Sequence, residues 1–244
     1  MTNIPLLFLP GMMCNHILWQ YQIEEFGKDR EVFVADFSNG STIEDMASKA
    51  LEAAPPEFIA VGLSMGGIVA FEMWKQAPKR ILGMALMDTN AYADSPARKK
   101  VRERQIVEAN DGALEQILIE ELKPNYLAPI HRNNKKLLDQ ILDMGSSLGV
   151  TVFEQQSVAL MHRGDQMSIL SKITCPVEVL CGKEDELCPI EYHQTITSRI
   201  DGARLTVLPD CGHMSSMEAP AMVNMMLRDL LARVEGGHRE AKYA

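Results

Sequence analysis

The chain has 244 residues, a formal net charge of −9 and 46% hydrophobic residues. This length fits one α/β domain with an insertion better than two independent domains. The negative charge, with no basic patch interleaved with aromatics, argues against a nucleic acid partner and against an anionic membrane surface. No apolar stretch reaches the roughly 20 residues that span a bilayer. No positive charge precedes the apolar run Ile4–Leu9, so we interpret it as a core strand rather than a signal peptide.

Short β-rich runs alternate with helix-length segments, which predicts a doubly wound, mainly parallel sheet of about six strands with helices on both faces. The expected strands are Pro5–Leu9, Glu31–Asp36, Phe58–Gly62, Leu82–Asp88, Val177–Cys181 and Leu205–Leu208. Helices are expected over Trp19–Phe26, Thr42–Ala53, Gly67–Gln76 and Met217–Arg233. The sequence Glu235-Gly236-Gly237 is expected to close the last helix, leaving 236–244 as a flexible tail.

Residues 91–173 interrupt the alternation and divide the core into 1–90 and 174–235. Helical spacing predicts amphipathic helices over Ala97–Asn110, Ala113–Leu122, Asn134–Met144 and Val152–Met161. An insertion at the carboxyl edge of a sheet is placed to cover a site there, so we expect a helical lid. The alternative is a helical layer that only lengthens the core. In the same way, Arg163 and Asp165 either contact a substrate or brace the lid against the body.

Ser64 lies in the sequence Gly62-Leu63-Ser64-Met65-Gly66, between an apolar β-like run and a helical pattern. In Gly-x-Ser-x-Gly the serine forms the apex of a tight strand-to-helix turn, in a strained backbone conformation. The following helix directs its N-terminal amides at the same place. Ser64 is therefore the candidate nucleophile; the alternative is a glycine-rich turn with an incidental serine.

A serine nucleophile needs a base, and the base needs a third group that fixes its tautomer. His213 follows the last strand in a turn and precedes a helix, so its ring is expected over the sheet edge. Asp185 is the candidate acid, because Gly-x-x-Asp-x-x-x-Pro turns one short carboxylate inward. Its neighbours Glu184 and Glu186 are expected to be solvated. Asp88, at the end of the fourth strand, is the main rival.

Two backbone N–H groups are expected to stabilise the oxyanion: Met65, after the nucleophile, and Met12, in the loop after the first strand. Weaker candidates line the substrate site: Met13, Thr89, Asn90 and Tyr92. The cysteines are Cys14, Cys175, Cys181, Cys188 and Cys211. Their odd number and irregular spacing argue against a zinc site and favour free thiols in a reducing cytoplasm.

With these motifs the chain resembles the α/β-hydrolase superfamily, whose order is Ser…Asp…His. Gly212-His213 followed by Glu218-Ala219-Pro220 is typical of its small esterase and enol-lactonase branch, as is Ile173-Thr174-Cys175-Pro176-Val177. Because the chain starts almost directly at Ile4, the resemblance implies a core without the N-terminal hairpin. It implies six parallel strands in the family's order 4-3-5-6-7-8. Pro10-Gly11 stands where members often carry His-Gly.

These residues predict a serine hydrolase that cleaves a small carboxylic ester or lactone through an acyl-enzyme, without metal or organic cofactor. The same triad can catalyse the hydrolysis of a carbon–carbon bond, a thioester or an amide, or the formation of a peracid. From a different class, the chain is alternatively a hydrolase-like ligand receptor or a structural interaction domain. The expected partner is a small molecule, the expected location is cytoplasmic, and a homodimer stays open.

Overall fold

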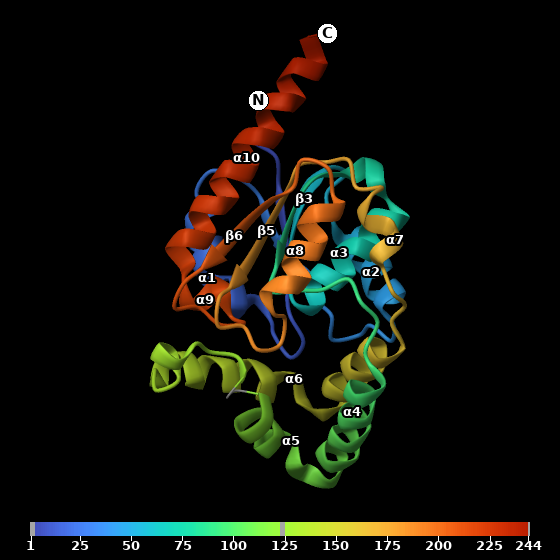
Figure 1. Cartoon of the computed structure of the whole chain (residues 1–244), viewed down its shortest axis with the longest axis vertical. Coiled ribbons are helices and arrows are strands. Elements are labelled where there is room, and N and C mark those ends of the chain that lie inside the picture. Colours follow the sequence, from blue (N-terminus) through green and yellow to red (C-terminus); the bar gives the residue numbers. More distant parts are fainter. Residues whose placement is uncertain (1–2, 123–124, 244) are drawn as a thin grey trace.

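A six-stranded parallel sheet forms the centre of the molecule (Figure 1). The computed structural model describes residues 3–122 and 125–243, with side chains described up to residue 237. The strands are β1 (Leu6–Leu9), β2 (Val32–Val34), β3 (Phe58–Leu63), β4 (Ile81–Met87), β5 (Val177–Gly182) and β6 (Arg204–Leu208). They lie in the order β2-β1-β3-β4-β5-β6, all paired in parallel, which confirms the expected sheet without an N-terminal hairpin.

The two faces of the sheet carry separate hydrophobic cores, because successive side chains of a strand point to opposite faces. Along β3, Ile59, Val61 and Leu63 belong to one core, while Phe58 and Ala60 belong to the other. The first core packs against η1 (His16–Trp19), α1 (Gln20–Phe26), α9 (Ser215–Glu218) and α10 (Pro220–Tyr243). The second packs against α2 (Ile43–Ala53), α3 (Met65–Gln76), α7 (Met167–Leu170) and α8 (Ile190–Arg199). A short turn, η2 (Pro78–Arg80), leads from α3 into β4.

Two core helices, α2 and α1, show how particular residues fix where a helix begins. Thr42 caps α2 by accepting a hydrogen bond from Asp45 N–H, and the Asp45 carboxylate accepts one from Ser41 N–H in return. This reciprocal cap satisfies backbone donors that the first helical turn leaves free. Trp19 is fully buried and its ring stacks on Phe8 at 4.9 Å, an aromatic contact worth about 0.5–1.5 kcal/mol beyond its buried area. Trp19 therefore anchors the start of α1.

A helical insertion between β4 and β5 lies beyond the carboxyl ends of the strands (Figure 1). It contains α4 (Pro96–Glu108), the π-helical turns η3 (Ala109–Ala113) and η4 (Ile117–Leu122), α5 (Leu114–Gln116), η6 (Pro129–His131) and α6 (Lys135–His162). Helix α7, although inside the expected bounds 91–173, packs beside α3 and α8 against the second core. The helices expected over Asn134–Met144 and Val152–Met161 form one element, α6. Gly149, at φ 79° and ψ 176°, kinks it between them.

Two expectations from the sequence differ from the structure. The last helix does not end before Gly236 and Gly237, because α10 continues to Tyr243. Neither glycine adopts the left-handed conformation that ends many helices, and a helical glycine costs only about 1 kcal/mol relative to alanine. Helix α8 was not expected at all.

Among the helices of the described residues, none is long and apolar enough to cross a membrane.

Candidate active site

Ser64 lies in the tight turn that connects β3 to α3. Its backbone lies at φ 55° and ψ −116°, a conformation that a residue with a Cβ adopts at a cost. Ser64 N–H donates to Met87 O at 2.9 Å, and Thr89 Oγ1 donates to Ser64 O at 2.7 Å, so the turn is fixed from β4. The turn also requires glycine at position 66, because a Cβ there would lie 1.9 Å from Leu9 O. The expected strand–turn–helix around Ser64 is present.

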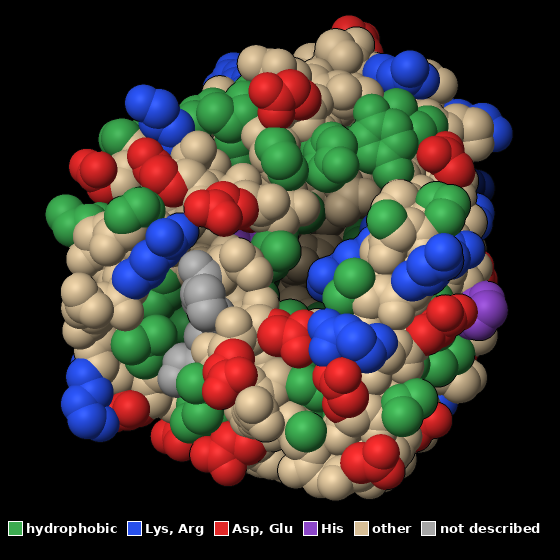
Figure 2. Space-filling model, turned by 60° about the horizontal axis from the view of Figure 1, so that its bottom comes forward, with side chains coloured by type: hydrophobic (Ala, Val, Ile, Leu, Met, Phe, Trp, Pro, Cys, Tyr) green, Lys and Arg blue, Asp and Glu red, His purple; other side chains and the backbone are tan. Residues whose placement is uncertain are grey.

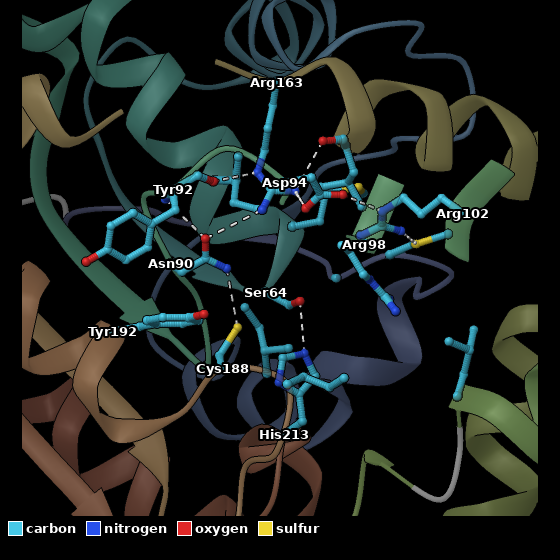
Figure 3. Close-up of a pocket in the computed structure, with 18 of the residues that line it drawn as sticks. Ser64, Asn90, Tyr92, Asp94, Arg98, Arg102, Arg163, Cys188, Tyr192 and His213 are labelled. Carbon is cyan, nitrogen blue, oxygen red and sulfur yellow. Dashed lines mark hydrogen bonds and ion pairs between the residues drawn. The ribbon is translucent and has the colours of Figure 1, made fainter. Parts of the chain in front are cut away.

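His213 and Asp185 meet Ser64 above the carboxyl edge of the sheet (Figure 3 shows the Ser64–His213 contact). His213 Nε2 lies 2.9 Å from Ser64 Oγ, and His213 Nδ1 lies 2.8 Å from Asp185 Oδ2. With Nδ1–H donating to the carboxylate, Nε2 is left to accept from the serine hydroxyl. Asp185 Oδ1 accepts from the N–H groups of Leu187 and Cys188, each at 2.9 Å, which holds the carboxylate in place.

The electrostatic surroundings of His213 act in opposite directions. Burial of the ring lowers its pKa, whereas the charge of Asp185, the hydrogen bond that the ring donates to Asp185 and the nearby Asp88 and Glu218 raise it. The sum raises the pKa of His213 above that of a free imidazole. The ring is thereby made a stronger base than histidine in water.

Asp88, the rival acid, makes no hydrogen bond to His213 and binds other groups instead. It is fully buried and accepts hydrogen bonds from Gly182 N–H and from the Ser215 hydroxyl. Burial, and secondly the charge of Asp185, raises the pKa of the Asp88 carboxyl well above its usual range. Asp88 thus connects the strand that precedes Asp185 with the segment that follows His213.

Glu184 differs from expectation. It is half-buried rather than solvated, and its Oε2 accepts a hydrogen bond from Cys211 N–H at 2.9 Å. Glu186 is exposed as expected and pairs with Arg132. The loop that carries Asp185 is therefore tied to the loop that carries His213 at a second point.

Glu218 fixes the histidine loop, a role that the sequence did not reveal although the residue belongs to a motif singled out there. Its Oε1 accepts from Gly212 N–H at 3.0 Å and Met214 N–H at 3.2 Å. Its Oε2 accepts from Ala128 N–H of the helical insertion at 2.8 Å. His213 N–H in turn donates to Tyr126 O at 2.8 Å, and the Tyr126 ring stacks on the imidazole. The insertion thus contacts the histidine loop directly.

Met12 and Met65, the expected oxyanion donors, both border the cavity in front of Ser64. The loop after β1 comes close to the serine, since a Cβ at Gly11 would lie 3.5 Å from Ser64 Cβ. Within the described part of the chain, neither Met12 N–H nor Met65 N–H donates to a protein group. Both amides are therefore available to a ligand.

A cavity of about 280 Å³ opens at Ser64 and His213. Viewed from the side of the helical insertion, the surface is hollowed at its centre, with Lys or Arg surface at the rim (Figure 2). Of the expected lining residues, Asn90 and Tyr92 border the cavity, but Met13 and Thr89 do not. Met13 packs into the hydrophobic core, and Thr89 is fully buried, with its N–H donating to His193 Nε2 at 2.9 Å.

Charged residues from the helical insertion also border the cavity: Asp94, Arg98, Arg102 and Arg163 (Figure 3). Arg163 pairs with Asp94 and donates to Tyr92 O, so it braces the insertion and borders the cavity at once. Sequence reasoning missed the other three. The spacing of Arg98 and Arg102, four residues apart on one helix face, was the available signal.

Among the described residues, Asp185, Cys188 and His213 form the one group of three potential metal ligands that lie close together. Burial raises the pKa of the Cys188 thiol well above its usual range, and this disfavours the thiolate that a metal would need. The Asp185 and His213 atoms concerned are already bonded to each other. All five cysteines are free thiols.

Comparison with known proteins agrees with the fold described above. The sequence profile of a family described as "Alpha/beta hydrolase family" matches residues 6–225. The structure is similar to that of a thermophilic esterase from Thermogutta terrifontis solved with malate bound, with a TM-score of 0.87 and 27% identity over 96% of this chain and 91% of that one. It is also similar to the enol-lactonase from Burkholderia xenovorans LB400, with a TM-score of 0.84 over 95% and 92% of the two chains; at 19% identity this similarity concerns the fold alone.

A curated relative from Bacillus subtilis (strain 168), provisionally named 2-succinyl-6-hydroxy-2,4-cyclohexadiene-1-carboxylate synthase, is 24% identical over 186 residues. The match covers 71% of this chain and 65% of the relative, slightly less than two thirds of its length.

Proposed function

The chain belongs to the alpha/beta hydrolase family, and from that premise we propose that it is a serine hydrolase that cleaves a small carboxylic ester or lactone through an acyl-enzyme. The single observation that carries the proposal is the continuous hydrogen-bonded path from Ser64 Oγ through His213 to Asp185. A serine hydroxyl, an imidazole and a carboxylate in this order are the groups that acyl transfer needs.

Each group has one role in this proposal. Ser64 attacks the acyl carbon while His213 Nε2 takes its proton, and Asp185 orients the ring and stabilises the imidazolium that forms. His213 then protonates the leaving alkoxide, which departs as an alcohol. Water, activated by the same imidazole, attacks the acyl-enzyme and releases the acid together with free Ser64.

The N–H groups of Met12 and Met65 are proposed to hold the oxyanion of the tetrahedral intermediate. Support comes from their position on the cavity wall and from the lack of a protein acceptor for either amide within residues 3–122 and 125–243. Loss of one such donor costs on the order of 10²–10³ in turnover in serine hydrolases.

The division of the chain is part of the same proposal. Residues 1–90 and 174–235 are the hydrolase core, and the helical insertion, 91–173, acts as a lid. The lid role is supported by side chains of the insertion that line the cavity, such as Tyr92 and Arg163. The flexibility of 236–244 stays a prediction.

A fluorophosphonate probe tests the proposal, since it phosphorylates an activated serine. We expect rapid stoichiometric labelling of the purified protein, with the adduct on Ser64 by peptide mass spectrometry. Ser216, which is fully buried and donates to Leu18 O, is an internal control that should stay unmodified. No adduct on Ser64, or an adduct only elsewhere, would contradict the proposal.

The alternative chemistries of this triad are separated by a substrate panel. Matched ester, lactone, thioester, amide and diketone substrates of one chain length would be compared by kcat/KM. The proposal requires that an ester or lactone gives the highest value. A ligand receptor with this frame would bind the compounds without turning them over or reacting promptly with the probe.

A further inference from the structure

The cavity at Ser64 has an excess of positive charge. Three arginines border it, Arg98, Arg102 and Arg163, and among the described lining residues Asp94 is the one carboxylate. The chain as a whole has a net charge of −9, so this local excess runs against the overall composition. Positive side chains gathered in a concave site raise the local concentration of anions.

Both carboxylate oxygens of Asp94 are paired with arginines of this cavity. Its Oδ2 accepts from Arg102 Nε at 2.7 Å, and its Oδ1 pairs with Arg163 Nη1 at 2.7 Å. All three side chains are buried. Arg163 also donates to Tyr92 O at 2.9 Å and to Leu160 O at 3.3 Å, so its donors are largely satisfied. Arg102, Arg163 and Asp94 together therefore have a net charge of +1.

Arg98 has no such partner. Its guanidinium makes no hydrogen bond or ion pair within the part of the chain that the structure describes, and no dashed line reaches it in Figure 3. The side chain is half-buried on the cavity wall, one helical turn before Arg102 on α4. Arg102 itself points Nη1 at the Met12 sulfur, 3.3 Å away, and a thioether is a weak acceptor.

Burial lowers the pKa of Arg102 to about 10, so it is still charged at neutral pH. Arg98 has no counterion among the described residues, and Arg102 shares Asp94 with Arg163, so both Arg98 and Arg102 border the cavity with donors left free. A guanidinium fork binds a planar carboxylate through two parallel hydrogen bonds. The contact of Arg102 with Met12 also brings the arginines next to the loop proposed to hold the oxyanion.

We propose that the substrate carries a carboxylate, which Arg98 and Arg102 bind while the scissile carbonyl lies at Ser64. The inference rests on the proposed function, because it names the substrate class of the same site. It assigns Arg98 the role of a specificity-determining residue and adds no chemical step to acyl transfer.

The first test compares acidic and neutral esters of equal length. One pair carries the charge in the acyl half: the 4-nitrophenyl monoester of glutaric acid and 4-nitrophenyl pentanoate. The other carries it in the alcohol half: 4-acetoxybenzoate and 4-methylphenyl acetate. In Arg98→Gln we expect kcat/KM for the acidic member of at least one pair to fall roughly 10- to 100-fold, mainly through KM, since a hydrogen bond to a charged group contributes about 1.5–3 kcal/mol.

The neutral members should change less than about twofold. Arg98→Lys, which keeps the charge but not the fork, should give an intermediate loss. Lys100→Gln is the matched control: it removes one positive charge from the exposed side of the same helix and should leave all four esters unchanged. Equal losses on acidic and neutral esters in Arg98→Gln would show a structural role and overturn the proposal, as would no loss on either acidic ester.

The second test does not depend on turnover. Glutarate binding is measured by calorimetry with the wild type, Arg98→Gln and Lys100→Gln. We expect binding to the wild type and to Lys100→Gln, and affinity for Arg98→Gln weaker by roughly tenfold or more. No binding to the wild type, or equal binding to Arg98→Gln, overturns the anion site. Arg98-dependent binding in a protein that hydrolyses no ester would instead support the anion site and contradict the proposed function.

Discussion

Gln156 Oε1 accepts a hydrogen bond of 2.8 Å from the backbone N–H of Met13, and so joins helix α6 to the loop after β1. Its amide also donates to Phe37 O at 3.2 Å, in the loop after β2. The side chain is almost fully buried. One residue of the helical insertion therefore fixes the loop whose Met12 amide is proposed to bind the oxyanion.

Replacing Gln156 by Leu should lower both stability and turnover. Two buried backbone groups would lose their partner, at about 1–3 kcal/mol for each, and the Met12 amide would lose its fixed position. We expect a lower free energy of unfolding in urea and a lower kcat. Gln155→Leu is the control, because Gln155 makes no hydrogen bond within the described residues that this change would remove. Unchanged kcat in Gln156→Leu would contradict the positioning role.

The two buried aspartates should respond differently to the same substitution. Asp185→Asn should lower kcat by about 10⁴, because an amide favours the wrong tautomer of His213. Asp88→Asn should cost less than about tenfold, since burial raises the pKa of Asp88 and already favours its neutral form. Steady-state kinetics on one aryl ester measures both. A larger loss in Asp88→Asn than in Asp185→Asn would make Asp88 the acid.

The pH dependence of kcat/KM should show one rising limb, because His213 must be neutral to take the proton of Ser64. Burial lowers the pKa of His213, but the charge and hydrogen bond of Asp185 outweigh it and raise that pKa. The midpoint should therefore lie above 6.5, the value of a free imidazole. It should move to lower pH in Asp185→Asn. A midpoint below 6.5 in the wild type would contradict this electrostatic account.

His193 should make the protein less stable in acid. Burial lowers its pKa to about 4, and its neutral Nε2 accepts from Thr89 N–H behind Ser64. Between pH 6.5 and 4 the unfolded chain binds the proton and the folded chain does not, so stability falls as the pH falls. At about 1.4 kcal/mol for each pH unit, the loss is about 3 kcal/mol.

Urea unfolding at several pH values measures this loss. His193→Gln removes the titrating group, so its stability should fall less steeply over the same interval. Parallel pH profiles for the wild type and His193→Gln would show that another group is responsible.

The sequence was sufficient where chemistry is local. The turn at Ser64, the strands that precede Asp185 and His213, and the helix that begins after Thr42 each depend on residues within one short window. The strand order followed from resemblance to a known family. Met12 and Met65 lie at fixed offsets from recognisable turns, so their place at the cavity was also predictable, while their role as oxyanion donors stays a prediction.

What the sequence did not reveal depends on contacts between distant segments. Glu218 binds Ala128 N–H, and Gln156 binds Met13 N–H 143 positions away. No local pattern distinguishes these side chains from solvated ones, because their partners are backbone groups. Thr89 was expected to line the cavity because it follows β4 directly. It is buried instead, because its N–H binds His193 of α8, a helix that the sequence did not predict.

Ser64→Ala measures the central claim most directly. With an aryl ester of the preferred chain length, kcat should fall by about 10⁶ if the three residues act as a unit. Circular dichroism and the unfolding midpoint should show that the variant is folded. A folded Ser64→Ala variant that keeps the turnover of the wild type would contradict the account.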